Sequence, residues 1–148
     1  RLHKLLETYD YTLDFKLHPI FETYKDYYNI NTDRVCLAPS TIPNAEYKVF
    51  ITDFSSFVYD FAYLKRAILY FNPDYHFFLA GMNDYRELDL PYEEAFGPFV
   101  QTAEEALDKI EKILSQNAIP AARYWERMEH LFFYKDNNQC ERIYEQLK

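Results

Sequence analysis

The stretch Val49–Arg66 reads VFITDFSSFVYDFAYLKR, and it predicts a strand, a polar turn and a helix in direct succession. Its first four residues are apolar or β-branched, which is typical of a strand covered on both faces in a parallel sheet. Asp53, Ser55 and Ser56 then interrupt the apolar run and are candidate N-caps for the following helix. A helix start offers free N–H groups and the positive end of the helix dipole. Ser55 and Ser56 are therefore predicted to bind phosphate.

Asp60 extends this hypothesis to a nucleotide. It lies four residues after Ser56, a spacing that places both side chains on one face of the predicted helix. A carboxylate set back from the helix start would accept hydrogen bonds from sugar hydroxyls while the serines hold phosphate. A simpler interpretation is that Asp53 and the serines only cap the helix, because every strand-to-helix junction needs a cap. The local pattern leaves both interpretations open.

Strands alternate with helices along the chain. The pattern predicts strands at 11–17, 35–38, 49–52, 67–71 and 99–100, and helices at 2–9, 20–28, 45–48, 102–114, 121–133 and 139–147. Residues 39–44 are a predicted connection, and 74–95 a predicted loop over the ligand end of the sheet. Thr102 and Glu105 form a predicted capping box. This order predicts an α/β fold, a Rossmann-like doubly wound parallel sheet followed by C-terminal helices.

Length and composition narrow the function classes. The 148 residues fit one domain, and a net charge of −8 argues against a nucleic-acid partner. With only 2 glycines, the phosphate turn is not a glycine-rich loop. Cys36 and Cys140 lie far apart in the sequence and are predicted to be reduced and structural. No apolar run approaches the length of a membrane span and no signal segment is present, so we expect a cytoplasmic fragment.

Three ordered blocks resemble the CDP-glycerol glycerophosphotransferase family, bacterial enzymes that prime or polymerise teichoic acids and related capsule polymers. The blocks are 14–19 (DFKLHP), 51–74 (from ITDFSS to NPD) and 96–102 (FGPFVQT). The resemblance covers nearly the whole chain but only the C-terminal, donor-binding half of a GT-B-type enzyme. It implies that residues 1–148 are a single nucleotide-donor-binding domain, a fragment of a longer two-domain chain.

The first block contains His18 and Lys16. His18 ends a predicted parallel strand, the position where ligands bind in open α/β sheets. Its imidazole would donate to phosphate or, when protonated, offset charge on a departing nucleotide. The alternative is a strand-end residue with a satisfied ring. The match to the family block implies a catalytic His18, and Lys16 should point to the same face of the strand.

Three further positions have both a functional and a structural interpretation. Gly97 lies in a segment that resembles a family loop near the donor, where a small residue lets the backbone approach a ligand. A plain turn would explain this glycine equally well. Lys65 and Arg66 are explained by the dipole at a helix C-terminus. Residues 136–142 (DNNQCER) resemble the start of the family's last helix but carry Cys140 at its usual serine position. We therefore interpret Asp136 as an N-cap. The other histidines show no metal-ligand spacing, so we expect no metal and no cofactor.

The resemblance implies transfer of glycerol phosphate from CDP-glycerol to a polymer or primer hydroxyl, with release of CMP. In-line attack on the β-phosphorus would occur while Ser55, Ser56 and His18 stabilise the leaving charge and Asp60 holds the ribose. The missing N-terminal half would supply the base and the groove for a polymer or lipid-linked acceptor. The parent protein would then work as a peripheral protein at the inner face of the membrane. Two alternatives remain, a nucleotide-sugar glycosyltransferase or epimerase of this architecture, and a non-catalytic flavodoxin-like interaction module.

Overall fold

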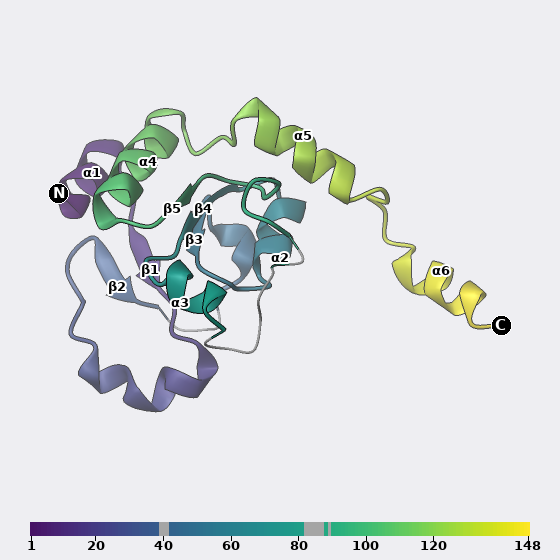
Figure 1. Ribbon diagram of the computed structural model, residues 1–148, viewed down its shortest axis with the longest axis horizontal. Coiled ribbons are helices and arrows are strands. Elements are labelled where there is room, and N and C mark those ends of the chain that lie inside the picture. Colours follow the sequence, from purple (N-terminus) through teal and green to yellow (C-terminus); the bar gives the residue numbers. More distant parts are fainter. Residues whose placement is uncertain (39–41, 82–87, 89) are drawn as a thin grey trace.

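A computed structural model describes residues 1–38, 42–81, 88 and 90–148. The elements in chain order are α1 Leu2–Tyr9, β1 Leu13–Phe15, η1 Pro19–Tyr27, β2 Val35–Leu37, η2 Asn44–Glu46, β3 Val49–Thr52, α2 Val58–Tyr63, β4 Ala67–Phe71, α3 Tyr75–Leu79, β5 Phe99–Val100, α4 Ala103–Ser115, α5 Ala122–Leu131 and α6 Gln139–Gln146 (Figure 1). Both η elements are 3₁₀ helices. No helix in these described ranges is long and apolar enough to cross a bilayer.

The strands pair in parallel, as predicted, but in two sheets. One sheet holds β1 and β2, and the other has the order β3-β4-β5. In the larger sheet Thr52 pairs with Tyr70, and Tyr70 in turn pairs with Phe99. The carboxyl ends of β3, β4 and β5 therefore meet at one edge, where Asp53 begins the serine turn. The α/β class is confirmed, and the strands predicted to form one doubly wound parallel sheet are divided between two parallel sheets among the described residues.

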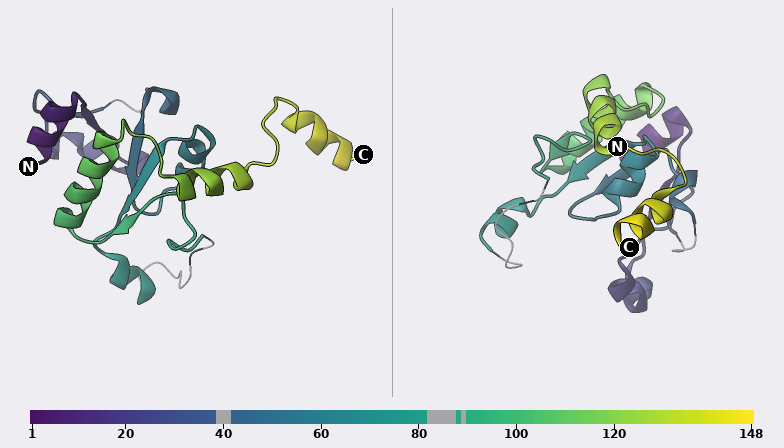
Figure 2. Two further views of the ribbon diagram at one scale, coloured as in Figure 1. Left: turned by 90° about the horizontal axis from the view of Figure 1, so that it is seen from above. Right: turned by 90° about the vertical axis from the view of Figure 1, so that its right-hand side faces the viewer.

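The larger sheet is covered on both faces, which confirms the doubly wound arrangement (Figure 2). Ile68 and Tyr70 of β4 pack against buried side chains of α2 and α5. Leu69, one residue along the strand, packs with buried side chains of α4 on the other face. Because successive strand residues point to opposite faces, β4 contributes to both cores, and four of its five residues are buried. This central strand fixes the turn at the sheet edge to a rigid support.

Three predicted elements differ from the structure. The helices predicted at 20–28 and 45–48 are the 3₁₀ helices η1 and η2, and the predicted loop 74–95 contains a helix, α3. Tyr75 of α3 makes edge contacts with the rings of Tyr92 and Phe99, at 5.2 and 5.1 Å between centroids. Aromatic packing thus outweighs the turn signals of the surrounding sequence. Residues 82–87 and 89 of that predicted loop, and 39–41 of the predicted connection, lie outside the described residues.

The predicted capping box of α4 is confirmed. The Thr102 hydroxyl accepts a hydrogen bond from the Glu105 amide at 3.3 Å, and the Glu105 carboxylate accepts one from the Thr102 amide at 3.1 Å. The Thr102 hydroxyl also donates to the Glu105 carboxylate at 2.8 Å, and this bond is the largest cause of the lowered pKa of Glu105. The box begins α4 directly after β5, which orients the helix along the face of the sheet that Leu69 lines.

Candidate functional site

The polar turn after β3 is built differently from the prediction. Phe57 is the N-cap of α2, and no side chain of the described residues caps this helix, so Asp53, Ser55 and Ser56 are not its N-caps. The Ser55 hydroxyl accepts from the Phe57 amide at 3.3 Å, and the Asp53 carboxylate accepts from the Phe54 amide at 2.7 Å. These short-range bonds shape the turn itself and delay the helix by one residue beyond the serines.

The two serines leave hydrogen-bond donors available. In the described part of the chain, the Ser55 amide, the Ser56 amide and the Ser56 hydroxyl donate no hydrogen bond. Ser56 is exposed and Ser55 is half-buried. Because α2 has only 6 residues, its dipole is small, and these individual donors are what the turn offers to an anion.

Asp60 lies on the exposed side of α2, where its Oδ2 accepts from Asn44 Nδ2 at 3.0 Å. Both residues line an open groove of about 1160 Å³ between α2 and the C-terminal segment. Aromatic and polar side chains of both walls line this groove, among them Tyr59, Tyr63 and Arg142. Sequence reasoning missed Asn44, because only the fold brings η2 beside α2, and it missed the tyrosines, because only the fold places the C-terminal segment opposite α2. Asp60 thus lies one helical turn from the serines, at the wall of a space large enough for a nucleotide.

His18 and Lys16 follow β1, in the sheet that is separate from β3. The exposed His18 is the N-cap of η1, and its Nδ1 accepts from the Ile20 amide at 3.3 Å. Lys16 Nζ donates to the Ile42 carbonyl at 2.9 Å and lies 4.7 Å from the centroid of the Tyr47 ring. The described contacts join neither residue to the serine turn. Their functional roles remain predictions, and each has a structural role as well.

Gly97 lies at the other end of the larger sheet from the serine turn. It precedes β5, beside Ile68 near the amino end of β4. A Cβ atom at this position would lie 1.9 Å from the Ile68 carbonyl oxygen. Close packing of two backbone segments therefore explains this glycine. The structure does not bring Gly97 together with Ser55 or Ser56, because parallel strands place their amino ends at the opposite edge.

Lys65 and Arg66 connect the end of α2 to other elements. Lys65 follows the C-cap of α2 in the left-handed conformation, with φ 54°. Its ammonium pairs with Glu129 of α5 and lies 4.9 Å from the centroid of the Trp125 ring. Arg66 donates to the Ala45 carbonyl of η2 at 3.1 Å. These contacts explain both cations as links that fix α2 against α5 and η2.

Asp136 stabilises the start of α6 without being its N-cap, which is Asn138. Its carboxylate accepts from the Asn138 amide at 2.9 Å and from Arg142 at 2.9 and 3.0 Å. The amide bond is the larger cause of the lowered pKa of Asp136, and Arg142 adds to it. The predicted cap was thus placed two residues too early, while its stabilising effect on the first turn is present. The thiols of Cys36 and Cys140 are free, and both residues are exposed.

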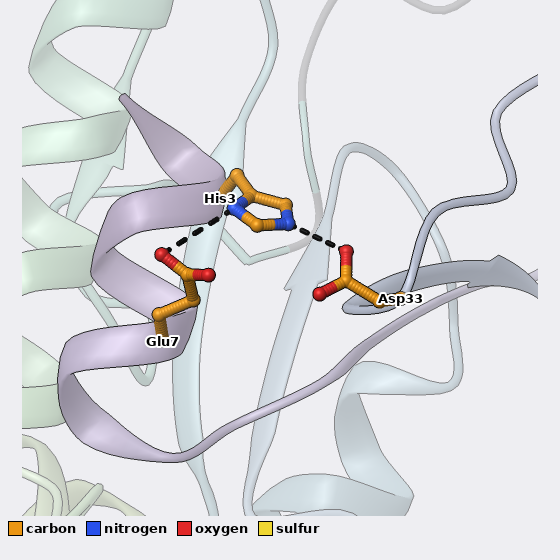
Figure 3. Close-up of side chains that lie close together, drawn as sticks. All are labelled: His3, Glu7 and Asp33. Atoms are coloured by element: carbon orange, nitrogen blue, oxygen red, sulfur yellow. Dashed lines mark hydrogen bonds and ion pairs between the residues drawn. The ribbon is translucent and has the colours of Figure 1, made fainter.

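A cluster of His3, Glu7 and Asp33 joins α1 to the segment before β2 (Figure 3). His3 Nε2 lies 2.7 Å from Asp33 Oδ1, and Nδ1 lies 3.6 Å from Glu7 Oε2. The hydrogen bond to Asp33 is the largest cause of the raised pKa of His3, and the same bond lowers the pKa of Asp33. The fold thus gives His3 the two acidic neighbours that its sequence spacing was not expected to provide. Each carboxylate faces a different ring nitrogen, an arrangement that suits a protonated imidazole better than chelation of an ion.

The comparisons with known proteins identify the family. Residues 1–148, the whole chain, match the family CDP-Glycerol:Poly(glycerophosphate) glycerophosphotransferase. The chain belongs to this family. The resemblance in the three sequence blocks is thereby confirmed over the whole chain.

Two curated relatives of this chain come from Bacillus subtilis (strain 168). The minor teichoic acid biosynthesis protein GgaB is 33% identical over 98 residues, which are 65% of the chain and 10% of the relative. The teichoic acid poly(glycerol phosphate) polymerase is 42% identical over 66 residues, 44% of the chain and 8% of the relative. The chain therefore spans about a tenth or less of the length of these relatives. No solved structure matches it.

Proposed function

We propose that this chain is the donor-binding part of an enzyme that transfers glycerol phosphate from CDP-glycerol to a teichoic acid. The family match over residues 1–148 carries the proposal. The names of the two relatives support a teichoic acid as the product. The architecture is compatible with this role, since open α/β sheets bind ligands beyond the carboxyl ends of their strands.

We place the diphosphate of the donor at the turn of Ser55 and Ser56. Support comes from the amides of both serines and the Ser56 hydroxyl, which donate no hydrogen bond within the described residues. The ribose would lie against Asp60, whose second carboxylate oxygen is not the one that Asn44 contacts. Tyr59 and Tyr63 in the adjoining groove would then contact the cytosine base.

The proposed reaction is a phosphoryl transfer. The acceptor hydroxyl attacks the β-phosphorus of CDP-glycerol, the bond from this phosphorus to the bridging oxygen breaks, and CMP leaves with its electron pair. A protonated His18 would offset the charge that develops on CMP, with Lys16 beside it. The base that takes the hydroxyl proton, and the acceptor groove, would belong to parts of the enzyme beyond these residues. This reaction would occur at the inner face of the membrane, where a cytoplasmic nucleotide meets a lipid-linked acceptor.

Transfer assays with the full-length protein test the proposal. Radiolabelled CDP-glycerol and a glycerol phosphate primer should give labelled polymer and equimolar CMP. UDP-sugars at the same concentration should give neither product. Transfer from UDP-sugars at equal or higher rate would instead support the glycosyltransferase alternative. Failure of the full-length protein to bind any nucleotide would support the interaction module.

A further inference from the structure

A buried chain of hydrogen bonds runs beneath the serine turn. Asn72, directly after β4, donates through Nδ2 to the Tyr92 hydroxyl at 3.4 Å. The Tyr92 hydroxyl donates to the Asp53 carbonyl at 3.3 Å. Asn72 Oδ1 accepts from the Asp74 amide at 3.2 Å, which holds the asparagine side chain in place. These hydrogen bonds thus connect the carboxyl ends of β4 and β3. They end at the Asp53 carbonyl, where the serine turn begins.

Burial makes this arrangement costly to disturb. Asn72 is only 2% exposed and Tyr92 only 8%. A buried polar group that loses its hydrogen-bond partner destabilises the fold by most of its desolvation penalty. Each side chain in this series of hydrogen bonds therefore depends on its neighbour. Burial is also the largest cause of the raised pKa of Tyr92, so its hydroxyl keeps its proton and donates at neutral pH. Apolar side chains would hold the sheet equally well. The hydrogen bonds from Asn72 through Tyr92 additionally specify the position of the Asp53 carbonyl.

The Tyr92 ring is fixed independently of its hydroxyl. It stacks on Phe99 with 4.0 Å between centroids and meets Tyr70 edge-on at 5.2 Å. Tyr70 is equally buried, at 4% exposed, yet its hydroxyl takes no part in the chain to Asp53. The two tyrosines thus share ring size, burial and a common contact. They differ in whether the hydroxyl reaches the serine turn.

We propose that Tyr92 and Asn72 are positioning residues for the diphosphate of the donor. By fixing the Asp53 carbonyl, they set the orientation of the Ser55 and Ser56 donors that follow it. Neither residue touches the ligand, and the inference rests on the proposed function of the serine turn. Preorganised donors bind a phosphate without the cost of ordering them at each encounter. Loss of the Tyr92 hydroxyl therefore weakens recognition of the phosphate group and spares the nucleoside.

Calorimetric titrations of the full-length protein with CMP and with cytidine separate recognition of the phosphate group from recognition of the nucleoside. Tyr92→Phe should raise the Kd for CMP about fivefold to tenfold, the scale of one hydrogen bond, and leave the Kd for cytidine unchanged. The matched variant Tyr70→Phe should change neither Kd. A Tyr92→Phe variant that weakens both ligands equally, or CMP no more than Tyr70→Phe does, overturns the inference.

A double-mutant cycle tests Asn72. Asn72→Asp keeps an acceptor for the Asp74 amide but removes the donor to Tyr92. If Asn72 acts through Tyr92, the double variant should lose no more preference for CMP over cytidine than Tyr92→Phe alone. Additive losses overturn this part of the inference. Failure of the proposed function is distinct, because the wild-type protein would then bind CMP no more tightly than cytidine.

Discussion

At the scale of single residues, the two serines are not equivalent. Ser55→Ala removes the acceptor of the Phe57 amide and should lower the free energy of unfolding by about 1 kcal/mol. Ser56→Ala should leave stability unchanged and weaken CMP binding, because the exposed Ser56 hydroxyl has no partner in the described chain. Thermal melts and CMP titrations of both variants would check this. If both variants shift the melting temperature and neither shifts CMP affinity, the turn is purely structural.

Asp60 distinguishes nucleotide binding from general anion binding. Its carboxylate repels phosphate but accepts from ribose hydroxyls, so Asp60→Ala should weaken CMP binding about tenfold or more. Binding of pyrophosphate should stay equal or become tighter. Titrating wild-type and variant protein with CMP, its 2′,3′-dideoxy analogue and pyrophosphate measures the affinity for each ligand. Wild-type protein should discriminate against the dideoxy nucleotide and the variant should not. Equal discrimination by both proteins would show that Asp60 does not contact the ribose.

His3 makes stability depend on pH. Because its pKa is raised in the folded protein, its contribution is fully present below the unfolded value of about 6.5 and is lost as pH rises through the folded pKa. The lowered pKa of Asp33 has the opposite sense, a contribution lost as pH falls through its folded value. Urea unfolding between pH 5.5 and 8.5 should show the stability gap between wild type and His3→Gln narrowing as pH rises.

The control for this measurement is His130→Gln in α5, where the ring contacts the Glu126 carbonyl and no carboxylate lies opposite in the described structure. The same pH series on this variant measures the effect of replacing a histidine that lacks such a partner among the described residues. A constant gap between wild type and His3→Gln over the whole range would mean that the contact with Asp33 does not stabilise the fold.

At the scale of elements, substitutions at the two glycines should destabilise the fold for different reasons. Gly97→Ala places a methyl group 1.9 Å from the Ile68 carbonyl oxygen, so β5 must move away from β4. We expect a loss of about 3 kcal/mol in stability, the upper range for overpacking. Gly81→Ala has open space but a φ of 88°, and should cost about 1–2 kcal/mol from backbone strain alone. Chemical denaturation gives both values, and a Gly97→Ala cost below that of Gly81→Ala would contradict this account.

The sequence predicts elements well where a local pattern also fits the tertiary contacts. The apolar run of β3 and the capping box of α4 are of this kind, since Thr102 and Glu105 satisfy each other within one turn. The helix α3 was missed because its stability comes from rings of distant residues, Tyr92 and Phe99. For the same reason the pattern suggested Ser55 and Ser56 but not Asn72. An isolated Asn before Pro resembles an ordinary strand end until its burial is known.

At the scale of the whole molecule, His18 belongs to a different sheet from the serine turn. The catalytic role that we propose for His18 requires the end of β1 to approach the donor together with Ser56. In the full-length enzyme His18→Ala should lower turnover about 100-fold, the scale of a positioned acid or charge stabiliser. His18→Asn retains an acceptor for the Ile20 amide, so it preserves the cap of η1. Turnover of His18→Asn within about threefold of wild type would leave His18 only its capping role.

The pairing of the larger sheet also has a kinetic consequence. Residues 53–66, which include α2, join β3 to β4, whereas the longer segment 72–98 separates β4 from β5. Closing a longer loop costs more conformational entropy before stabilising contacts form. Contacts between strands far apart in the sequence therefore slow folding. We therefore expect β3, α2 and β4 to assemble early and β5 to dock last. Because Tyr92 lies in that late segment, the hydrogen bond that fixes the Asp53 carbonyl would be among the final contacts to form.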